Sequence, residues 1–158
     1  MPGDKHYKNF EERVSLPIVV ELEISLNDVL CETFQKQLSP TTNPIRVCSL
    51  EDILAEKLRA LLQQLVRNRS RPQDVYDIAS RMRDRGEHID FAKVSEFLLR
   101  KAKARDISPT KSSYNDDVMQ RAMVGYDQEI KASANVFIPF DEAWEDVKRF
   151  VERLSIPE

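Results

Sequence analysis

The chain has 158 residues, enough for one ordinary domain with a substantial core or for a smaller unit with an extension. Apolar residues make up 41% and charged residues 32%, which is typical of a soluble, helix-rich globular protein and excludes a largely disordered chain. The net charge of −3 gives no general attraction to nucleic acid or an anionic membrane, and no apolar run is long enough to span a bilayer.

The first predicted element is a strand over residues 16–25, LPIVVELEIS. Apolar side chains at alternate positions from Val20 to Ile24 share one face, and Glu21 and Glu23 lie together on the other. Two interpretations of the two carboxylates are open. They are either the solvated face of an edge strand or ligands for a metal ion.

Residues 27–38 are predicted to form a short helix or a loop, followed by a breaker cluster over residues 39–44. Residues 45–48 are a short extended segment that can pair with the first strand. A two-stranded unit is marginal in water, so these strands should belong to a larger sheet or pack on helices. Cys31 and Cys48 lack metal-ligand spacing and indicate reduced thiols in a cytoplasmic protein.

A long amphipathic helix follows, with Ser49 as its N-cap and Asp52 in a position like that of a capping box. Lys57 falls within the apolar stripe of this helix, whereas Glu56 and Arg59 are expected to face solvent. A lysine in such a stripe must either extend its stem to water or meet a buried anion. The apolar stripe consists of Leu50, Ile53, Leu54, Leu58, Leu61, Leu62 and Leu65.

After a basic connection, Pro72 suits the first turn of a second helix, which ends at Gly86. Asp74 and Asp77 are three residues apart and share one flank near the start of this helix. Carboxylates in a first turn also favour the helix dipole, which gives them a purely structural explanation.

Three further helices are predicted. The first is capped by Asp90 and has a solvated basic end at residues 100–105. The second starts near Tyr114 or Asn115 and reaches Tyr126, and the last is capped by Asp141. The sequence therefore predicts a mostly helical α+β fold, with a β region over residues 1–48 and a helical domain of about five helices over residues 49–158.

No GxSxG elbow, P-loop, GxGxxG or HExxH motif is present. What remains is Glu21 or Glu23 on a strand, Lys57 on the central helix, and Asp74 with Asp77 on the next. Carboxylates that hold Mg²⁺ beside a lysine that contacts phosphates are typical of phosphoryl or nucleotidyl transfer. Ion pairs between packed helices explain the same lysine and aspartates equally well.

The run SLEDILAEKLRALLQ followed by QDVYDI resembles the AbiEii/AbiGii nucleotidyltransferase toxin family, the toxin half of type IV toxin–antitoxin and abortive-infection systems. The strand VVELEIS and the segment FIPFDEAW are also similar to that family, so the resemblance spans residues 18–158. It implies catalytic roles for Glu23, Lys57, Asp74 and Asp77, nucleotide contacts from Lys57 and Tyr76, and a metal contact from Glu23.

Two departures from the family pattern matter. Gln73 stands where the family has an arginine, so an Arg–Asp clamp must come from Arg69 or Arg71, which then also become candidates for phosphate or acceptor contacts. The GG(S/T) turn and DxD strand of the family are absent from this sequence. The resemblance therefore implies the C-terminal part of such a protein, with its strands as the far edge of a nucleotidyltransferase sheet.

The resemblance implies Mg²⁺-dependent transfer of a nucleotide from an NTP to an RNA, such as tRNA, or to a protein acceptor. It also implies a cognate antitoxin as partner. The alternative is a catalytically inactive helical module that binds an antitoxin or a separate N-terminal half. An exposed strand edge would in addition allow self-association.

Overall fold

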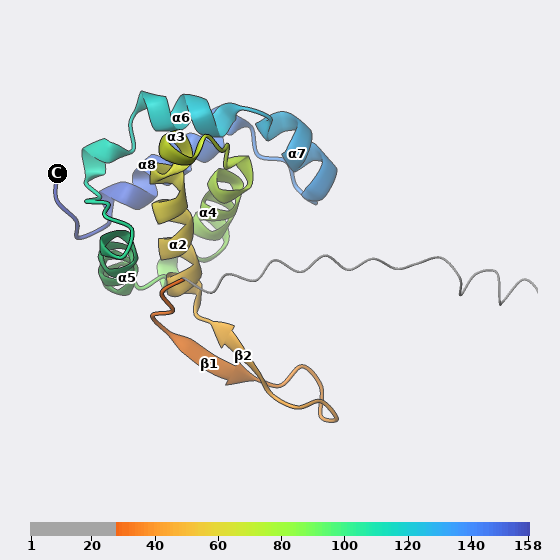
Figure 1. The fold of residues 1–158 in the computed structure, drawn as a ribbon. Helices are drawn as coiled ribbons and strands as arrows, with labels where there is room; N and C mark the ends of the chain where they lie inside the picture. Colours follow the sequence, from red (N-terminus) through yellow and green to blue (C-terminus); the bar gives the residue numbers. More distant parts are fainter. Residues whose placement is uncertain (1–27) are drawn as a thin grey trace, which may run out of the picture.

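The computed structural model describes residues 28–158 and is mostly helical, with one small antiparallel sheet, as the sequence predicts (Figure 1). None of the helices in this part of the chain is long and apolar enough to cross a membrane. The elements in chain order are β1 (Thr33–Lys36), β2 (Ile45–Cys48), α2 (Leu50–Leu62), α3 (Gln64–Arg67), α4 (Pro72–Arg85), the 3-10 turn η1 (Gly86–His88), α5 (Phe91–Lys103), the 3-10 turn η2 (Lys111–Ser113), α6 (Asp116–Met123), α7 (Tyr126–Ser133) and α8 (Phe140–Glu152).

The two strands form a hairpin. β1 and β2 pair antiparallel with Thr33 opposite Cys48, and the breaker cluster between them closes through a hydrogen bond from the Thr42 amide to the Ser39 carbonyl. The prediction of a helix or loop over residues 27–38 is therefore wrong at β1, where Thr33 and Phe34 favour a strand and pairing with β2 fixes the extended conformation. The predicted strand over residues 16–25 lies outside the described residues.

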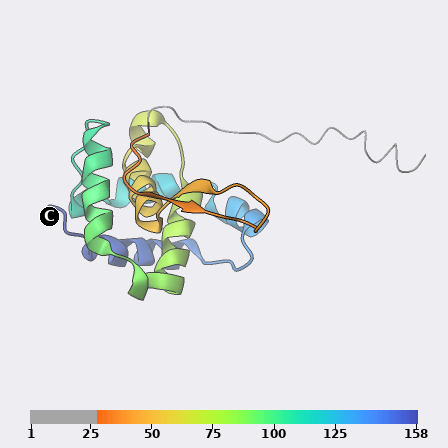
Figure 2. The ribbon, with the colours of Figure 1, turned by 90° about the horizontal axis from the view of Figure 1, so that it is seen from below.

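The hairpin projects from the end of α2 where that helix begins, and lies across the helical part when viewed from below (Figures 1 and 2). The segment that leads into β1 is tied to the helices by polar contacts. Glu32 accepts a hydrogen bond from the Ser49 amide through its carbonyl, at 3.1 Å, and its carboxylate lies 2.7 Å from Lys93. The hairpin is therefore anchored at its base, where the candidate site lies.

The central helix α2 packs on α5 on one side and on α4 on the other, and α4 packs on α8. Leu54, Leu58 and Leu61 are fully buried, as the apolar stripe predicts, whereas Ile53 remains partly exposed. The expectation that Arg59 faces solvent is wrong. Its guanidinium folds back on its own helix, and its buried charge is satisfied there. Its partners are Glu56 and Gln63.

Two helix boundaries differ from the predictions near the C-terminus. The helix expected from residue 114 to 126 is broken into α6 and α7 at Gly125, whose φ of 79° a glycine adopts without steric cost. The last helix begins one residue before Asp141, with Pro139 at its N-cap, so Asp141 lies in the first turn instead of capping it. Its apolar face, including Trp144 and Phe150, is buried as predicted.

Asp90 caps α5 as the sequence predicts, because its Oδ1 accepts hydrogen bonds from the amides of Ala92 and Lys93, both at 3.1 Å. Replacing Asp90 with alanine is expected to lower the free energy of unfolding by about 1 kcal/mol, since two amides of the first turn lose their acceptor. Asp84→Ala, an exposed change near the end of α4, should stay within about 0.5 kcal/mol of wild type. Equal urea midpoints for both variants would contradict this account of the cap.

Candidate functional site

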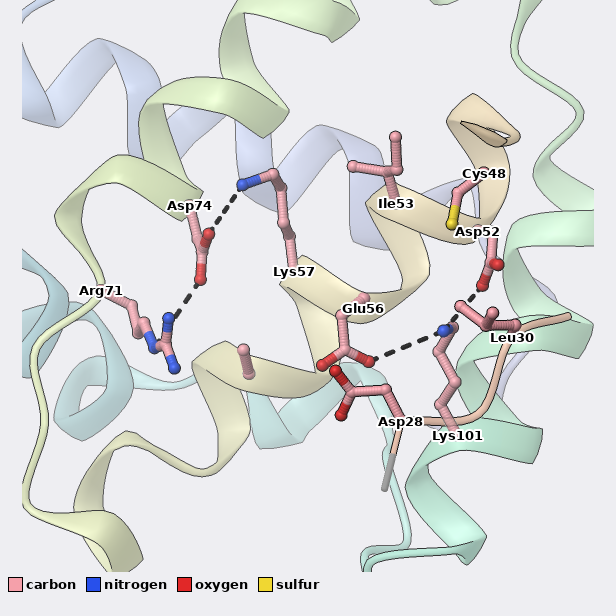
Figure 3. Close-up of a pocket in the computed structure, with 11 residues that line it drawn as sticks. Asp28, Leu30, Cys48, Asp52, Ile53, Glu56, Lys57, Arg71, Asp74 and Lys101 are labelled. Atoms are coloured by element: carbon pink, nitrogen blue, oxygen red, sulfur yellow. Dashed lines mark hydrogen bonds and ion pairs between the residues drawn. The ribbon is translucent and has the colours of Figure 1, made fainter. Parts of the chain in front are cut away.

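Lys57 on α2 lies between two carboxylates of α4, of which Figure 3 shows Asp74. Its ammonium nitrogen is 2.9 Å from Asp74 Oδ1 and 2.7 Å from Asp77 Oδ2. The lysine that interrupts the apolar stripe therefore pairs with anions instead of extending its stem to water. The structure thus brings together three of the four residues for which the resemblance implies catalytic roles.

Local structure explains how the two aspartates converge. Pro72 occupies the first turn of α4, and the helical spacing places Asp74 and Asp77 one turn apart on the flank that faces α2. Gln73 donates a hydrogen bond to Asp77 Oδ1 at 3.1 Å, and Arg71 Nε lies 4.0 Å from Asp74 Oδ2. Each aspartate is thus held by a second polar side chain as well as by Lys57.

Two opposing influences act on the pKa of Lys57. Burial of the ammonium is the largest single influence and lowers the pKa, but the attraction of Asp74, its hydrogen bond, and the contacts with Asp77 together outweigh it. The net result is a pKa raised above the ordinary lysine value. The ammonium is therefore fully charged at neutral pH.

The raised pKa sets the pH range of this stabilisation. A lysine whose pKa is raised in the folded state contributes its full stabilisation at pH values below its unfolded-state pKa of 10.5. That stabilisation is lost as the pH rises through the folded-state pKa. We expect the difference in unfolding free energy between wild type and Lys57→Met to be constant from about pH 7 to about pH 9.5 and to shrink above about pH 10.5.

Urea denaturation across this pH range measures the difference. Burial raises the pKa of Tyr126 to about 12, so this tyrosine ionises only at alkaline pH. Its ionisation affects wild type and Lys57→Met equally and cancels in the difference between them. If the difference in unfolding free energy already decreases at pH values below about 9, the ion pairs of Lys57 are not its source.

Lys57 and Asp74 line an open hollow of about 290 Å³ between α2, the start of α4, α5 and the segment before β1 (Figure 3). Asp77 lines a neighbouring hollow that Lys57 also borders. Each of the four carboxylates that line the hollow has a cationic partner. These pairs join Asp28 to Arg105, Asp52 and Glu56 to Lys101, and Asp74 to Lys57 and Arg71.

The pair of Lys101 and Asp52 is the most buried of these contacts, with 4% and 1% of the side chains exposed. Lys101 Nζ approaches Asp52 Oδ1 at 2.7 Å as an ion pair without the alignment of a hydrogen bond. Asp52 Oδ2 accepts hydrogen bonds from the amides of Cys31 and Glu32, at 3.1 and 3.4 Å. Asp52 therefore joins α2, α5 and the base of the hairpin.

Sequence reasoning missed this pair. It assigned Lys101 to a solvated basic helix end and Asp52 to a capping box. Ser49 does cap α2 by accepting from the Asp52 amide, but the Asp52 carboxylate turns toward Lys101. The signal that could have found it is helical spacing, because Lys101 follows Val94 and Leu98 on the buried face of α5 just as Lys57 follows leucines on α2.

The remaining predicted site residues lie elsewhere. The Tyr76 hydroxyl donates to the Val136 carbonyl at 2.8 Å, and Tyr76 does not line the hollow. Of the two candidate clamp residues, Arg71 approaches Asp74, whereas Arg69 lies with other arginines at a shallow depression beside α3. Glu23 lies outside the described residues.

A magnesium ion does not fit the donor set seen here. Within residues 28–158 no group of three or more His, Cys, Asp or Glu side chains lies close enough to hold a metal ion. The carboxylates that line the hollow are neutralised by lysine and arginine, which compete directly with a cation for the same oxygens.

Over residues 6–153 the chain matches the family described as "Nucleotidyl transferase AbiEii toxin, Type IV TA system". The match covers nearly the whole chain, so the protein belongs to this family of nucleotidyltransferase toxins. The resemblance drawn from the central helix and the DVYDI motif is thereby confirmed. Comparisons with curated proteins and with solved structures found no match.

Proposed function

We propose that the protein acts as an AbiEii-type toxin that transfers a nucleotide from an NTP to an RNA, such as tRNA, or to a protein acceptor, with Mg²⁺ as the family implies. The observation that carries this proposal is the position of Lys57, held between Asp74 and Asp77 at the rim of a hollow. A charged ammonium there can contact a phosphate oxygen of the nucleotide.

In this proposal one ion pair of Lys57 is exchanged for a phosphate contact. Asp77 is the carboxylate that gives way, because 32% of its side chain is exposed against 10% for Asp74, so its release to water costs less. Asp74 then keeps the ammonium in place, and Arg71 offers a second cation at the same rim. Tyr76 is proposed to support nucleotide binding from outside the hollow.

The metal enters this proposal through Glu23, the strand carboxylate matched by resemblance. We derive no step on Mg²⁺ from the described carboxylates, since those that line the hollow are already paired with cations. Because the family is a type IV toxin family, a cognate antitoxin is the proposed partner and the cytoplasm the proposed location.

The test is incubation of the chain with Mg²⁺, each labelled NTP and total tRNA, and in parallel with a cell protein extract. Wild type should transfer label to RNA or protein, and Lys57→Met should abolish the transfer. Lys103→Met, which removes an exposed lysine from α5, should leave transfer unchanged. Absence of both NTP binding and label transfer in wild type would contradict the proposal.

A second candidate function is that of a catalytically inactive module that binds an antitoxin or a separate N-terminal half. The pairing of the carboxylates of the hollow with lysine and arginine favours this candidate, because it leaves them no free charge to hold a metal ion. The hairpin favours it as well, since its outer strand edges have no strand partner among residues 28–158. Such an edge would also allow self-association. Size-exclusion chromatography with the cognate antitoxin is the test, and a monodisperse monomer that ignores the antitoxin would count against this candidate.

A further inference from the structure

Four large apolar side chains are exposed where α3 meets the end of α6, at the opposite end of α2 from the hairpin (Figure 1). Val66 is 87% exposed, the most of any large apolar residue in the described part of the chain. Together with three arginines, one on α3, one in the connection after it and one on α6, they form what we call the α3 corner. The α3 corner consists of Leu65, Val66, Met123 and Val124 with Arg67, Arg69 and Arg121.

The backbone of the α3 corner is fixed by hydrogen bonds between its two parts. The Ser70 hydroxyl lies 3.1 Å from the Arg121 carbonyl and 2.8 Å from that of Val124. The buried Gln64 amide donates to the Val118 carbonyl at 3.2 Å and accepts from the Arg71 amide at 2.9 Å. The exposed apolar side chains are therefore presented by a defined surface that needs little ordering before it binds.

The positive charge of the α3 corner has no carboxylate partner within the described part of the chain. Arg67, Arg69 and Arg121 make no ion pair with a carboxylate among residues 28–158, although Arg121 donates to the Asn68 amide oxygen and to the Arg69 carbonyl. Other cations of the fold, such as Lys57 and Lys101, are paired. Unpaired arginines beside exposed apolar side chains are the composition found at the centres of protein interfaces.

We propose that the α3 corner docks an acidic segment of a partner protein, in which apolar residues stand between aspartates or glutamates. Apolar side chains would cover Val66 and its neighbours, and carboxylates would pair with the guanidinium groups in bidentate geometry. A second copy of the corner is disfavoured, because a two-fold contact would place arginines opposite arginines. A nucleic-acid backbone would use the arginines but leave the apolar side chains uncovered.

The probe is a displayed library of random peptides selected on the full chain. Selected peptides should be enriched in Asp and Glu next to Leu, Ile or Phe, and their binding should weaken with rising salt. Val66→Asp and Arg69→Glu should each weaken binding by about tenfold or more. Val136→Asp, at another exposed apolar residue, and Lys103→Glu are the matched controls and should bind as wild type.

Two outcomes would overturn the proposal. The first is a selection that yields no peptide sensitive to Val66→Asp and Arg69→Glu. The second is tighter, corner-dependent binding of single-stranded RNA or of vesicles rich in phosphatidylserine, measured in parallel, than of any selected peptide. Circular dichroism of each variant checks that the fold is retained. Neither outcome depends on nucleotidyl transfer, so this proposal stands or fails separately from the proposed function.

Discussion

Replacing Lys101 with methionine is expected to lower the free energy of unfolding by about 3–5 kcal/mol, the largest effect of any single substitution considered for this protein. The change removes the cation from a pair that is almost fully buried and leaves the Asp52 carboxylate without a counter-charge. The amides of Cys31 and Glu32 donate hydrogen bonds to Asp52, but they offset only part of the cost of burying its charge.

Urea denaturation of Lys101→Met beside Lys103→Met measures this effect. Lys103 lies on the same helix but is exposed, so its replacement should change stability by less than about 0.5 kcal/mol. The double variant Asp52→Leu/Lys101→Met should recover part of the loss, because no buried charge remains, but not all of it, because the Cys31 and Glu32 amides lose their acceptor. Equal stability of Lys101→Met and Lys103→Met would contradict the buried pair.

Replacing Lys57 with methionine is expected to cost about 1–3 kcal/mol, less than the change at Lys101 because Lys57 and Asp77 are partly exposed. A lysine that only extended its stem past leucines would give the opposite result, since methionine suits an apolar stripe and would leave stability unchanged or improved. The sign of the change therefore distinguishes an ion pair from packing.

Asp74→Asn and Asp77→Asn complete this test. Asp74 is the more buried partner and also approaches Arg71, so its replacement should cost more than that of Asp77. Thermal melts of the three single variants and of Lys57→Met/Asp74→Asn measure the coupling between the two residues. Strict additivity of the two changes would mean that the observed contact contributes nothing to stability.

Periodicity made Asp74 and Asp77 the candidate partners of Lys57 but left two outcomes open. A charge inside a run of leucines either extends its stem to water or meets an anion, and the structure shows that it meets the two carboxylates on the next helix. The same spacing places Lys101 on the buried face of α5, but basic residues near a helix C-terminus also have a sufficient explanation in the helix dipole, which conceals the signal.

Other features were not predicted. The pairing of β1 depends on a segment farther along the chain, whereas the signals for Arg59 and for the break at Gly125 are local. β1 is a strand because β2 pairs with it; Thr33 and Phe34 favour that conformation, whereas Lys36 does not. Arg59 is buried through contacts with Glu56 and Gln63, which lie three and four residues away at the spacing where side chains meet along a helix. The break between α6 and α7 does have a local signal, Gly125, which an apolar helical pattern on either side conceals.

The central claim is that Lys57 serves nucleotide transfer and does not only join α2 to α4 through ion pairs. Label transfer by Lys57→Arg tests it most directly. Arginine keeps the positive charge between Asp74 and Asp77, so the fold should melt close to wild type, but its longer side chain and planar fork of donors do not put a donor at the position of the compact ammonium, so the contact with the reacting phosphate is misplaced. We expect transfer to fall by about tenfold or more while stability is retained. Transfer at the wild-type rate in this folded variant would contradict the claim.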